Sequence, residues 1–430
     1  MDLPRILIVG TIPFNPSTQS RAMGSYFGCW EKDKRAAQIF SNPNKPVHGH
    51  CSTFYQITDS MMLSAMLHRK KCEGIIYSDS QLDDQVPGCN KSGQQLTSKI
   101  FNIAKRNKSY LVRLLRKILW NKKRWLTESL TNWINDFNPD IIYLAFSNDF
   151  FINEIALYIA KLKKIPIVTV IGDDYVFNRK FSISPFYFIY AKKYRKLVRS
   201  IFSYNTGVLY TSEKIREKYT KFFNNQNDVI YISSDFKCAP TLNLGDQPKR
   251  IIYAGNLALG RHKPLYDVMR CVEKMDNVEL DVYASLVPKS FLKKAKKFSH
   301  TTLFNPIPYN SLMSKISESN SILIVESFTK RDIKTTEFSL STKVADGLMS
   351  GIPIIAYGPQ QSGCIYYLEQ NLNGCVCTNK NCLNEHINKC VFNIEYRETI
   401  SNQEQKLALT NHTKEKNSLI FYNFVKKMVK

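Results

Sequence analysis

The strongest candidate for an anion-binding site lies within residues 337–359, which read EFSLSTKVADGLMSGIPIIAYGP. Ser341 and Thr342 are natural N-cap residues, so we expect a helix that begins near Lys343 and ends at Gly351. The free N–H groups and the partial positive charge at such a helix start suit a diphosphate. Lys343 in the first turn opposes the helix dipole, unless an anionic ligand lies in front of it. The alternative is a lysine that extends into solvent.

A second candidate anion site is the stretch 253–264 (YAGNLALGRHKP), where an apolar run ends in a turn bracketed by Gly255 and Gly260. Glycine allows the backbone to approach a ligand closely, and the Arg261 guanidinium can bind phosphate oxygens through two parallel hydrogen bonds. The alternative is an ordinary loop after a strand, with its charges in solvent.

A pair of acids, Asp173 and Asp174, follows Gly172 directly after the apolar run 165–171. A carboxylate at the carboxyl end of a strand is well placed to orient a hydroxyl group, and we favour Asp174 for this role. The alternative is that the two aspartates cap the following segment. Gly-Asp-Asp is also typical of metal-binding polymerase hairpins, but the flanking runs predict buried parallel strands and no partner acidic motif is present.

The cysteines and histidines do not predict a metal site. Cys375, Cys377, Cys382 and Cys390 lack the paired Cys-x-x-Cys spacing of zinc sites, and His48 and His50 beside Cys51 are isolated. We therefore expect no metal and no separate cofactor. The eleven cysteines, an odd number without a regular framework, are typical of a reducing cytosol.

The scaffold that positions these residues is predicted to be α/β, with two doubly wound Rossmann-like domains facing a cleft. A chain of 430 residues with 43% hydrophobic content is too long for one core and too apolar for disorder. Short apolar runs alternate with helical segments, at residues 5–10, 74–77, 140–146, 165–171 and 207–210 and again at 250–254, 278–283, 321–325 and 352–357. We expect an N-terminal domain over 1–240, a linker over 241–249, a C-terminal domain over 250–404 and a terminal helix over 405–430.

The charge is strongly positive, with 60 Lys and Arg against 36 Asp and Glu, a net of +24. Such a surface attracts polyanions. Residues 99–124 contain ten basic residues and no acid, interleaved with leucines, and 187–199 (YFIYAKKYRKLVR) are similar. Either segment could be an interfacial helix on anionic lipid, or a core-packed helix with a solvated basic face. No recognition motif supports nucleic acid, and no apolar run is long enough to span a bilayer.

Together, the two candidate anion sites resemble the nucleotide-sugar-binding domain of GT-B glycosyltransferases, above all the large retaining family four. In that family a Gly-Arg-Leu turn is followed by a lysine; here Gly255, Asn256 and Leu257 form the turn and Arg261 takes the lysine position. An acid holds the nucleotide ribose ahead of an Ala-Met-Ala-x-Gly-x-Pro segment, which places Asp346 before GLMSGIP.

The chain also departs from the family pattern. The family's first acid would lie eight residues before Asp346, where Phe338 stands, and Glu337 is one residue away. Residues 304–312 (FNPIPYNSL), with Ile307 in them, are similar to the base-contacting strand end, and 411–417 resemble the closing helix that crosses back to the first domain.

The resemblance implies a metal-independent, retaining transferase that moves a sugar from a nucleotide-sugar to a lipid-linked or growing surface glycan of the capsule or O-antigen kind. Asp346 would hold the ribose, and Glu337 is the candidate for the family's first acid in the nucleotide-sugar site. Ser341, Thr342, Lys343 and Arg261 would surround the diphosphate, and Asp174 would orient the acceptor. The expected location is the cytoplasmic face of a bacterial inner membrane. Two alternatives remain: a nucleic-acid-binding protein, and a catalytically inert GT-B-like subunit.

Overall fold

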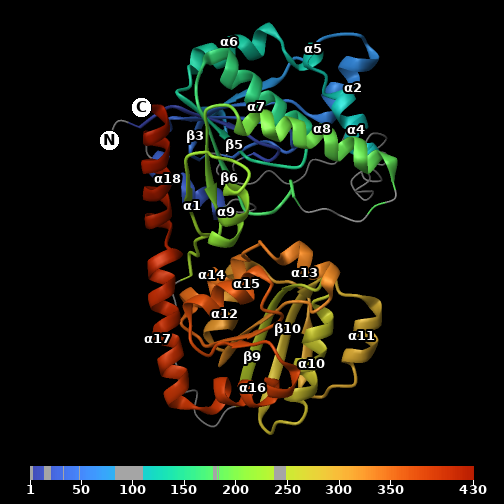
Figure 1. The fold of residues 1–430 in the computed structure, drawn as a ribbon, viewed down its shortest axis with the longest axis vertical. Helices are drawn as coiled ribbons and strands as arrows, with labels where there is room; N and C mark the ends of the chain where they lie inside the picture. Colours follow the sequence, from blue (N-terminus) through green and yellow to red (C-terminus); the bar gives the residue numbers. More distant parts are fainter. Residues whose placement is uncertain are drawn as a thin grey trace.

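The computed structural model describes residues 3–13, 21–31, 33–47, 49–82, 110–177, 182, 184–236 and 248–430. These residues form two α/β lobes, each built on its own largely parallel sheet, with one lobe above the other in Figure 1. The predicted fold class is confirmed. Residues 99–109, most of the predicted linker and much of the loop after the first strand lie outside the described residues.

The N-terminal lobe contains a sheet in the order β4-β3-β2-β1-β5-β6-β7-β8. The strands are β1 Ile6–Val9, β2 Ala36–Phe40, β3 Cys51–Gln56, β4 Ile75–Ser78, β5 Ile141–Leu144, β6 Ile167–Ile171, β7 Thr206–Tyr210 and β8 Asn227–Val229. All neighbours pair in parallel except β3 and β4. The apolar run at 74–77 therefore forms a strand, as expected, but not one of the buried parallel strands that such runs favour. Strand β4 is an antiparallel edge strand, and Ile75 and Ile76 are 45% and 49% exposed.

The C-terminal lobe contains a parallel sheet in the order β11-β10-β9-β12-β13-β14. Its strands are β9 Lys249–Asn256, β10 Val278–Ser285, β11 Thr301–Phe304, β12 Ser321–Val325, β13 Ile354–Tyr357 and β14 Val376–Cys377. Strand order reverses between β9 and β12, and ligands of doubly wound sheets bind beyond the carboxyl ends of the strands at such a switch point. The turn at Gly255 and the residue after Val325 both lie at this edge.

The C-terminal tail consists of two helices, which run along the left side of Figure 1. Helix α17 (Ile394–Asn411) packs on the C-terminal lobe, and α18 (Lys414–Val429) packs on the N-terminal lobe. The ring of Phe421 packs against both Phe27 and Tyr143, with centroids 5.0 and 5.7 Å away. The two helices meet at His412, whose Nδ1 lies 2.6 Å from the carbonyl of Ile232 on the segment that connects the lobes.

Helix α4 (Tyr110–Leu119) covers the N-terminal lobe with its basic side chains turned inward. Arg116 pairs with Asp59 at 2.9 Å and with Asp149 at 2.8 Å, and Lys117 pairs with Glu154. The expectation of a basic face toward lipid or solvent is therefore wrong for Arg116 and Lys117. The opposite face is apolar and outward, with the exposed residues Leu111, Leu115 and Ile118. None of the described helices has the length and hydropathy of a membrane span.

Candidate active site between the lobes

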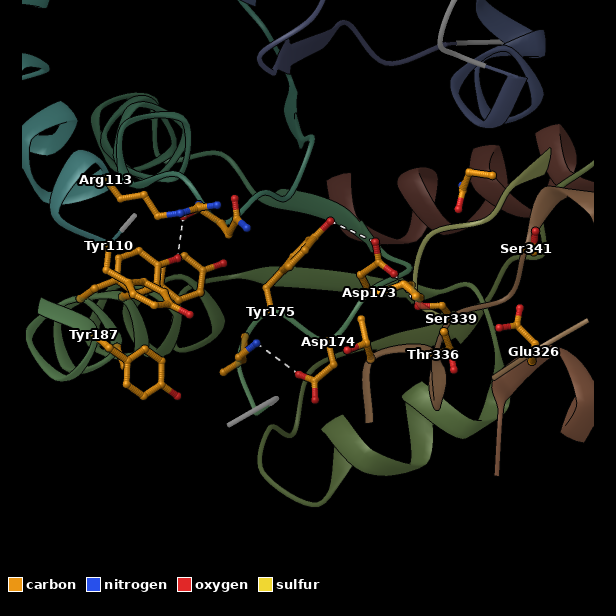
Figure 2. Close-up of a pocket in the computed structure, with 18 of the residues that line it drawn as sticks. Tyr110, Arg113, Asp173, Asp174, Tyr175, Tyr187, Glu326, Thr336, Ser339 and Ser341 are labelled. Carbon is orange, nitrogen blue, oxygen red and sulfur yellow. Dashed lines mark hydrogen bonds between the residues drawn. The ribbon is translucent and has the colours of Figure 1, made fainter. Parts of the chain in front are cut away.

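A cavity of about 590 Å³ lies between the two lobes, at the carboxyl edge of the C-terminal sheet. Figure 2 shows side chains from both lobes converging on it, with Asp173 and Tyr175 from the N-terminal lobe opposite Ser339 and Ser341. Arg261 and Lys343, which the sequence placed in two separate candidate sites, both line this cavity. The Ser339 hydroxyl donates to Asp173 at 2.5 Å, so the lobes are in direct contact beside it.

Lys343 lies in the first turn of helix α14 (Thr342–Ser350). The Ser341 hydroxyl caps the helix by accepting from the Lys343 N–H at 3.3 Å, and Gly351 ends it with φ 67°, as the sequence predicted. The Lys343 ammonium group lies 3.4 Å from the Tyr253 hydroxyl and 4.5 Å from the centre of the Tyr253 ring. Lys343 forms no ion pair with any residue that the structure describes. Burial, and then the positive charge of Arg261, lower the pKa of Lys343 to about 8.

Gly255 provides the space that Lys343 occupies. It is the second-last residue of β9 and has φ 150°, and a Cβ atom at this position would lie 1.9 Å from the Lys343 ammonium nitrogen. Any larger residue would displace the lysine side chain. Gly255, which was predicted to let a ligand approach the backbone, therefore packs against the Lys343 side chain.

Arg261 is held by a carboxylate that sequence analysis missed. Glu326 directly follows β12, is 2% exposed, and accepts from Arg261 Nε and Nη2 at 3.2 and 3.1 Å. Arg261 Nη1 donates to Asn256 Oδ1 at 3.1 Å. Burial would lower the pKa of Arg261, but Glu326 outweighs burial and the pKa is raised. The guanidinium fork predicted to be open for phosphate is therefore occupied by Glu326 and Asn256. An acid at the end of a buried strand was the signal that could have found Glu326.

A smaller chamber of about 240 Å³ adjoins the first, since Lys343 lines both. Its walls are largely apolar, with Ile307, Leu312 and Tyr283 among them, and Gly255, Thr342 and Asp346 supply the edge near Lys343. Asp346 Oδ1 accepts from the Tyr309 hydroxyl at 2.9 Å and from the Ser234 hydroxyl at 2.7 Å. Neither hydroxyl was singled out from sequence. The structure thus brings the predicted residues Ile307, Thr342 and Asp346 together around one chamber.

The two acids after β6 differ in their surroundings. Asp174 caps the backbone N–H groups of Val176 and Phe177 and pairs with Lys218 at 2.8 Å, and its side chain is 4% exposed. Asp173 accepts from the Tyr175 hydroxyl at 3.1 Å and from Ser339, at the wall of the cavity (Figure 2). The oxygens of Asp174 are bonded within its own lobe, so Asp174 caps the following segment, which was the alternative interpretation of this residue. The acid that faces the other lobe is Asp173.

Glu337 lies away from both chambers. It is the C-cap of helix α13 (Lys330–Thr336) and lines neither cavity. Burial lowers the pKa of Lys214, and the negative charge of Glu337 opposes that shift. Phe338, at the family's acid position, packs under Lys218 with 4.0 Å from the ammonium to the ring centre. The structure therefore does not bring Glu337 to the predicted nucleotide-sugar site, where it was the candidate for the family's first acid. Across the described ranges, no group of three or more His, Cys, Asp or Glu residues could hold a metal ion.

Comparison with known proteins rests on structure, since no protein-family model and no curated protein sequence matches the chain. The fold is similar to that of sucrose-phosphate synthase from Thermosynechococcus elongatus, with a TM-score of 0.60 and 11% identity over 99% of both chains. It is similar to HepE from Anabaena, solved with UDP-glucose, with a TM-score of 0.58 and 12% identity over 98% of this chain and 99% of that one. The lipopolysaccharide outer core galactosyltransferase WaaB gives a TM-score of 0.54 at 12% identity, over 99% of this chain and 98% of its own. The chain therefore has the GT-B fold.

Proposed function

We propose that this protein is a glycosyltransferase that transfers a sugar from a nucleotide-sugar to an acceptor held by the N-terminal lobe. The observation that carries the proposal is Lys343. A buried ammonium group without an ion pair among the described residues, at the start of α14, is an arrangement that an anionic ligand would stabilise. It lies where the two chambers join, which is where a diphosphate between a nucleoside and a sugar would have to lie.

In this proposal the donor extends through both chambers. The base would lie against Ile307 and Tyr283 in the smaller chamber, and the ribose hydroxyls would approach Asp346. The diphosphate would accept from the first N–H groups of α14, near Ser341 and Thr342, and from Lys343. The sugar would then extend into the larger cavity, toward Arg261 and the opposite lobe.

The chemistry requires stabilisation of the leaving group. As the bond from sugar C1 to the phosphate oxygen breaks, negative charge grows on the nucleoside diphosphate. Lys343 and the α14 dipole would stabilise that charge most at the transition state, because they are fixed in place and screened from water. These groups can supply the charge stabilisation without a metal ion. Retention of configuration is the outcome that the family-four resemblance implies.

Asp173 is the better candidate to orient the acceptor hydroxyl, in place of Asp174. Its carboxylate is at the cavity wall and is positioned by Tyr175 and Ser339 from opposite lobes. Arg261 and Glu326 together form a neutral pair that fixes Asn256 at the end of β9 and shapes the sugar end of the cavity.

The acceptor we propose is a lipid-linked or growing surface glycan, with the protein at the cytoplasmic face of the membrane. The exposed apolar stripe Leu111, Leu115 and Ile118 on α4 supports a membrane contact, since an outward apolar face can insert into the interfacial layer. That WaaB acts on lipopolysaccharide outer core is consistent with such an acceptor.

The proposal is tested by incubating the full chain with a panel of labelled nucleotide-sugars and membrane-extracted glycolipids, and measuring label transfer and nucleotide release. We expect transfer with at least one donor, and a loss of about 10²–10³-fold in Lys343→Gln. The matched control is Lys274→Gln, an exposed lysine just after helix α10 (His262–Val272) that lines neither chamber. Nucleotide binding without turnover would instead indicate an inert GT-B-like subunit, and binding only to DNA or RNA would indicate a nucleic-acid protein.

A further inference from the structure

A wide groove of about 2240 Å³ leads outward from the cavity between the lobes. It is continuous with the cavity, because Tyr110, Tyr187, Arg195 and Arg261 line both. One of its walls is helix α8 (Pro185–Phe202) in the N-terminal lobe, and the opposite wall is helix α13 in the C-terminal lobe. The groove therefore connects the solvent to the position proposed for sugar transfer.

Both walls of the groove are basic. On α8, Lys192, Arg195, Lys196 and Arg199 recur at i, i+3, i+4 and i+7, the spacing that places side chains on one face of a helix, and all four line the groove. Lys330, Arg331 and Lys334 line it from α13. The only acid in the described lining is Asp332, whose carboxylate accepts from the Ser327 hydroxyl at 2.9 Å.

Most of these charges have no neutralising partner within the part of the chain that the structure describes. Among the described residues, Lys192, Lys196, Arg199, Lys330 and Arg331 form no ion pair, in contrast to the inward-facing Arg116 and Lys117 of α4. Like charges that converge from two lobes repel one another, and a concave arrangement concentrates the field. Such a groove attracts a ligand that carries several negative charges. A single sugar phosphate would neutralise only a small part of the positive charge in the groove.

We propose that this groove binds a polyanionic saccharide, a glycan with repeated carboxylate or phosphate groups, and guides its end into the transfer cavity. Lys192 and Arg199 are seven residues apart on one helix, a rise of about 10 Å, so the ligand needs anionic groups at intervals along its length. Tyr110 and Tyr187, with ring centres 4.9 Å apart at the inner end, provide apolar faces for sugar rings. The role as acceptor rests on the proposed function; the binding of a polyanion does not.

Two other polyanions are less well suited to this place. A lipid surface is flat, whereas these basic residues line a concave groove between two lobes. A nucleic acid would match the charge, but the groove ends at Asp173, Tyr175 and the donor chambers, which a hydroxyl-bearing saccharide end can use and a nucleic acid does not need.

The test measures binding of the full chain to four probes: an oligogalacturonate, its fully methyl-esterified neutral counterpart, linear inorganic polyphosphate and single-stranded DNA. The groove variant is the triple change Lys192→Gln, Lys196→Gln and Arg199→Gln. The control removes the same charge outside the groove, with Lys293→Gln, Lys296→Gln and Lys297→Gln, which are exposed on or beside helix α11 (Lys289–Ala295) and do not line the groove.

We expect oligogalacturonate or polyphosphate to bind with an affinity that falls steeply with salt and drops at least tenfold, by about 1.4 kcal/mol, in the groove variant. The control should change affinity less than twofold, and the neutral ester should bind weakly to all forms. Preference between the two anions identifies carboxylate or phosphate as the recognised group. Equal binding of charged and neutral oligosaccharides, equal losses in both triple variants, or tighter binding of DNA than of either anion would overturn the proposal.

The affinity for nucleoside diphosphates, measured on the same variants, separates this inference from the proposed function. The groove variant should keep it unchanged, because none of the three substituted residues lines the donor chambers. If no nucleotide binds while the polyanion binds in the groove, the transferase proposal fails and the groove assignment stands. If a nucleotide binds and no polyanion does, the groove assignment fails and the transferase proposal stands.

Discussion

The carboxylate of Glu326 and the guanidinium of Arg261 meet through two hydrogen bonds, of 3.2 and 3.1 Å, at the carboxyl edge where strand order reverses. The pair neutralises the arginine within the protein. Lys343 on the neighbouring helix has no such partner among the described residues and is left as the desolvated cation of the cavity. The division of roles between these two cations determines what each substitution should do.

Breaking the Arg261–Glu326 pair should destabilise the fold. Their side chains are 13% and 3% exposed, so Arg261→Ala leaves a buried carboxylate without its counter-charge. We expect a loss of about 3–5 kcal/mol in the free energy of unfolding, measured by urea denaturation. The double variant Arg261→Met with Glu326→Leu should recover part of that loss. A single variant as stable as the native protein would show that the pair does not form.

Substitution of Gly255 should act through Lys343. In Gly255→Ala the new methyl group would lie within 1.9 Å of the present position of the ammonium nitrogen, so the lysine must move. We expect at least a tenfold weaker affinity for nucleoside diphosphates, about 1.4 kcal/mol, by calorimetry. Gly24→Ala in helix α1 (Arg21–Tyr26) is the control, because its Cβ would meet nothing within 4 Å. Unchanged nucleotide affinity in Gly255→Ala would argue against a diphosphate beside Lys343.

The pH dependence of nucleotide binding should report the protonation of Lys343. Its pKa in the free protein is lowered from 10.5 to about 8, and a bound diphosphate favours the protonated form. Affinity should therefore fall as pH rises above about 8, with uptake of a proton on binding that calorimetry in buffers of different ionisation enthalpy can detect. The same shift makes this group's contribution to stability increase between pH 8 and 10.5, since the unfolded chain then holds more protons. A flat binding profile across pH 7–9.5 would contradict the assignment.

Asp173 and Asp174 should separate function from stability. Asp173→Asn removes the carboxylate at the cavity wall that contacts the opposite lobe, and we expect about 10²–10⁴-fold slower transfer with the free energy of unfolding changed by less than about 1 kcal/mol. Asp174→Asn removes a buried ion pair and the carboxylate that accepts from two backbone N–H groups of its own loop, so it should cost about 2–3 kcal/mol of stability. Transfer rates and denaturation curves of both variants decide this, and the reverse pattern would restore the acceptor role to Asp174.

Membrane contact should depend on the apolar stripe of α4. Leu115→Ser with Ile118→Ser removes two side chains that are 55% and 62% exposed, and we expect at least a tenfold lower partition onto vesicles containing anionic lipid. Leu409→Ser with Leu419→Ser, which are 64% and 49% exposed on α17 and α18, is the control. Equal loss from both pairs, or none from the α4 pair, would exclude this stripe as the contact.

The sequence predicted best those elements whose signals are local. Ser341 and Gly351 mark both ends of α14 because capping depends on the residue type at one position. Strands β2 and β3 were not predicted, since polar residues such as Gln38 and Ser52 interrupt their apolar pattern, and the antiparallel pairing of β4 depends on distant neighbours.

Side-chain partners across the fold could not be predicted in this way. Glu326, after strand β12, neutralises Arg261, which follows strand β9. Lys218, on a later helix, pairs with Asp174. In both cases the partner lies outside the motif that suggested a function for the residue, so the motif alone could not show that the residue is already paired. The inward turn of Arg116 likewise depends on Asp59 and Asp149, which lie on other elements.

The most direct test of the central claim is the calorimetric affinity of the native protein, Lys343→Gln and Lys274→Gln for UDP, GDP, ADP and related diphosphates at pH 7. The account predicts that one nucleoside diphosphate binds the native protein and Lys274→Gln alike, and binds Lys343→Gln at least a hundredfold more weakly, about 2.7 kcal/mol. Equal affinity of Lys343→Gln and the native protein for that nucleotide would contradict it.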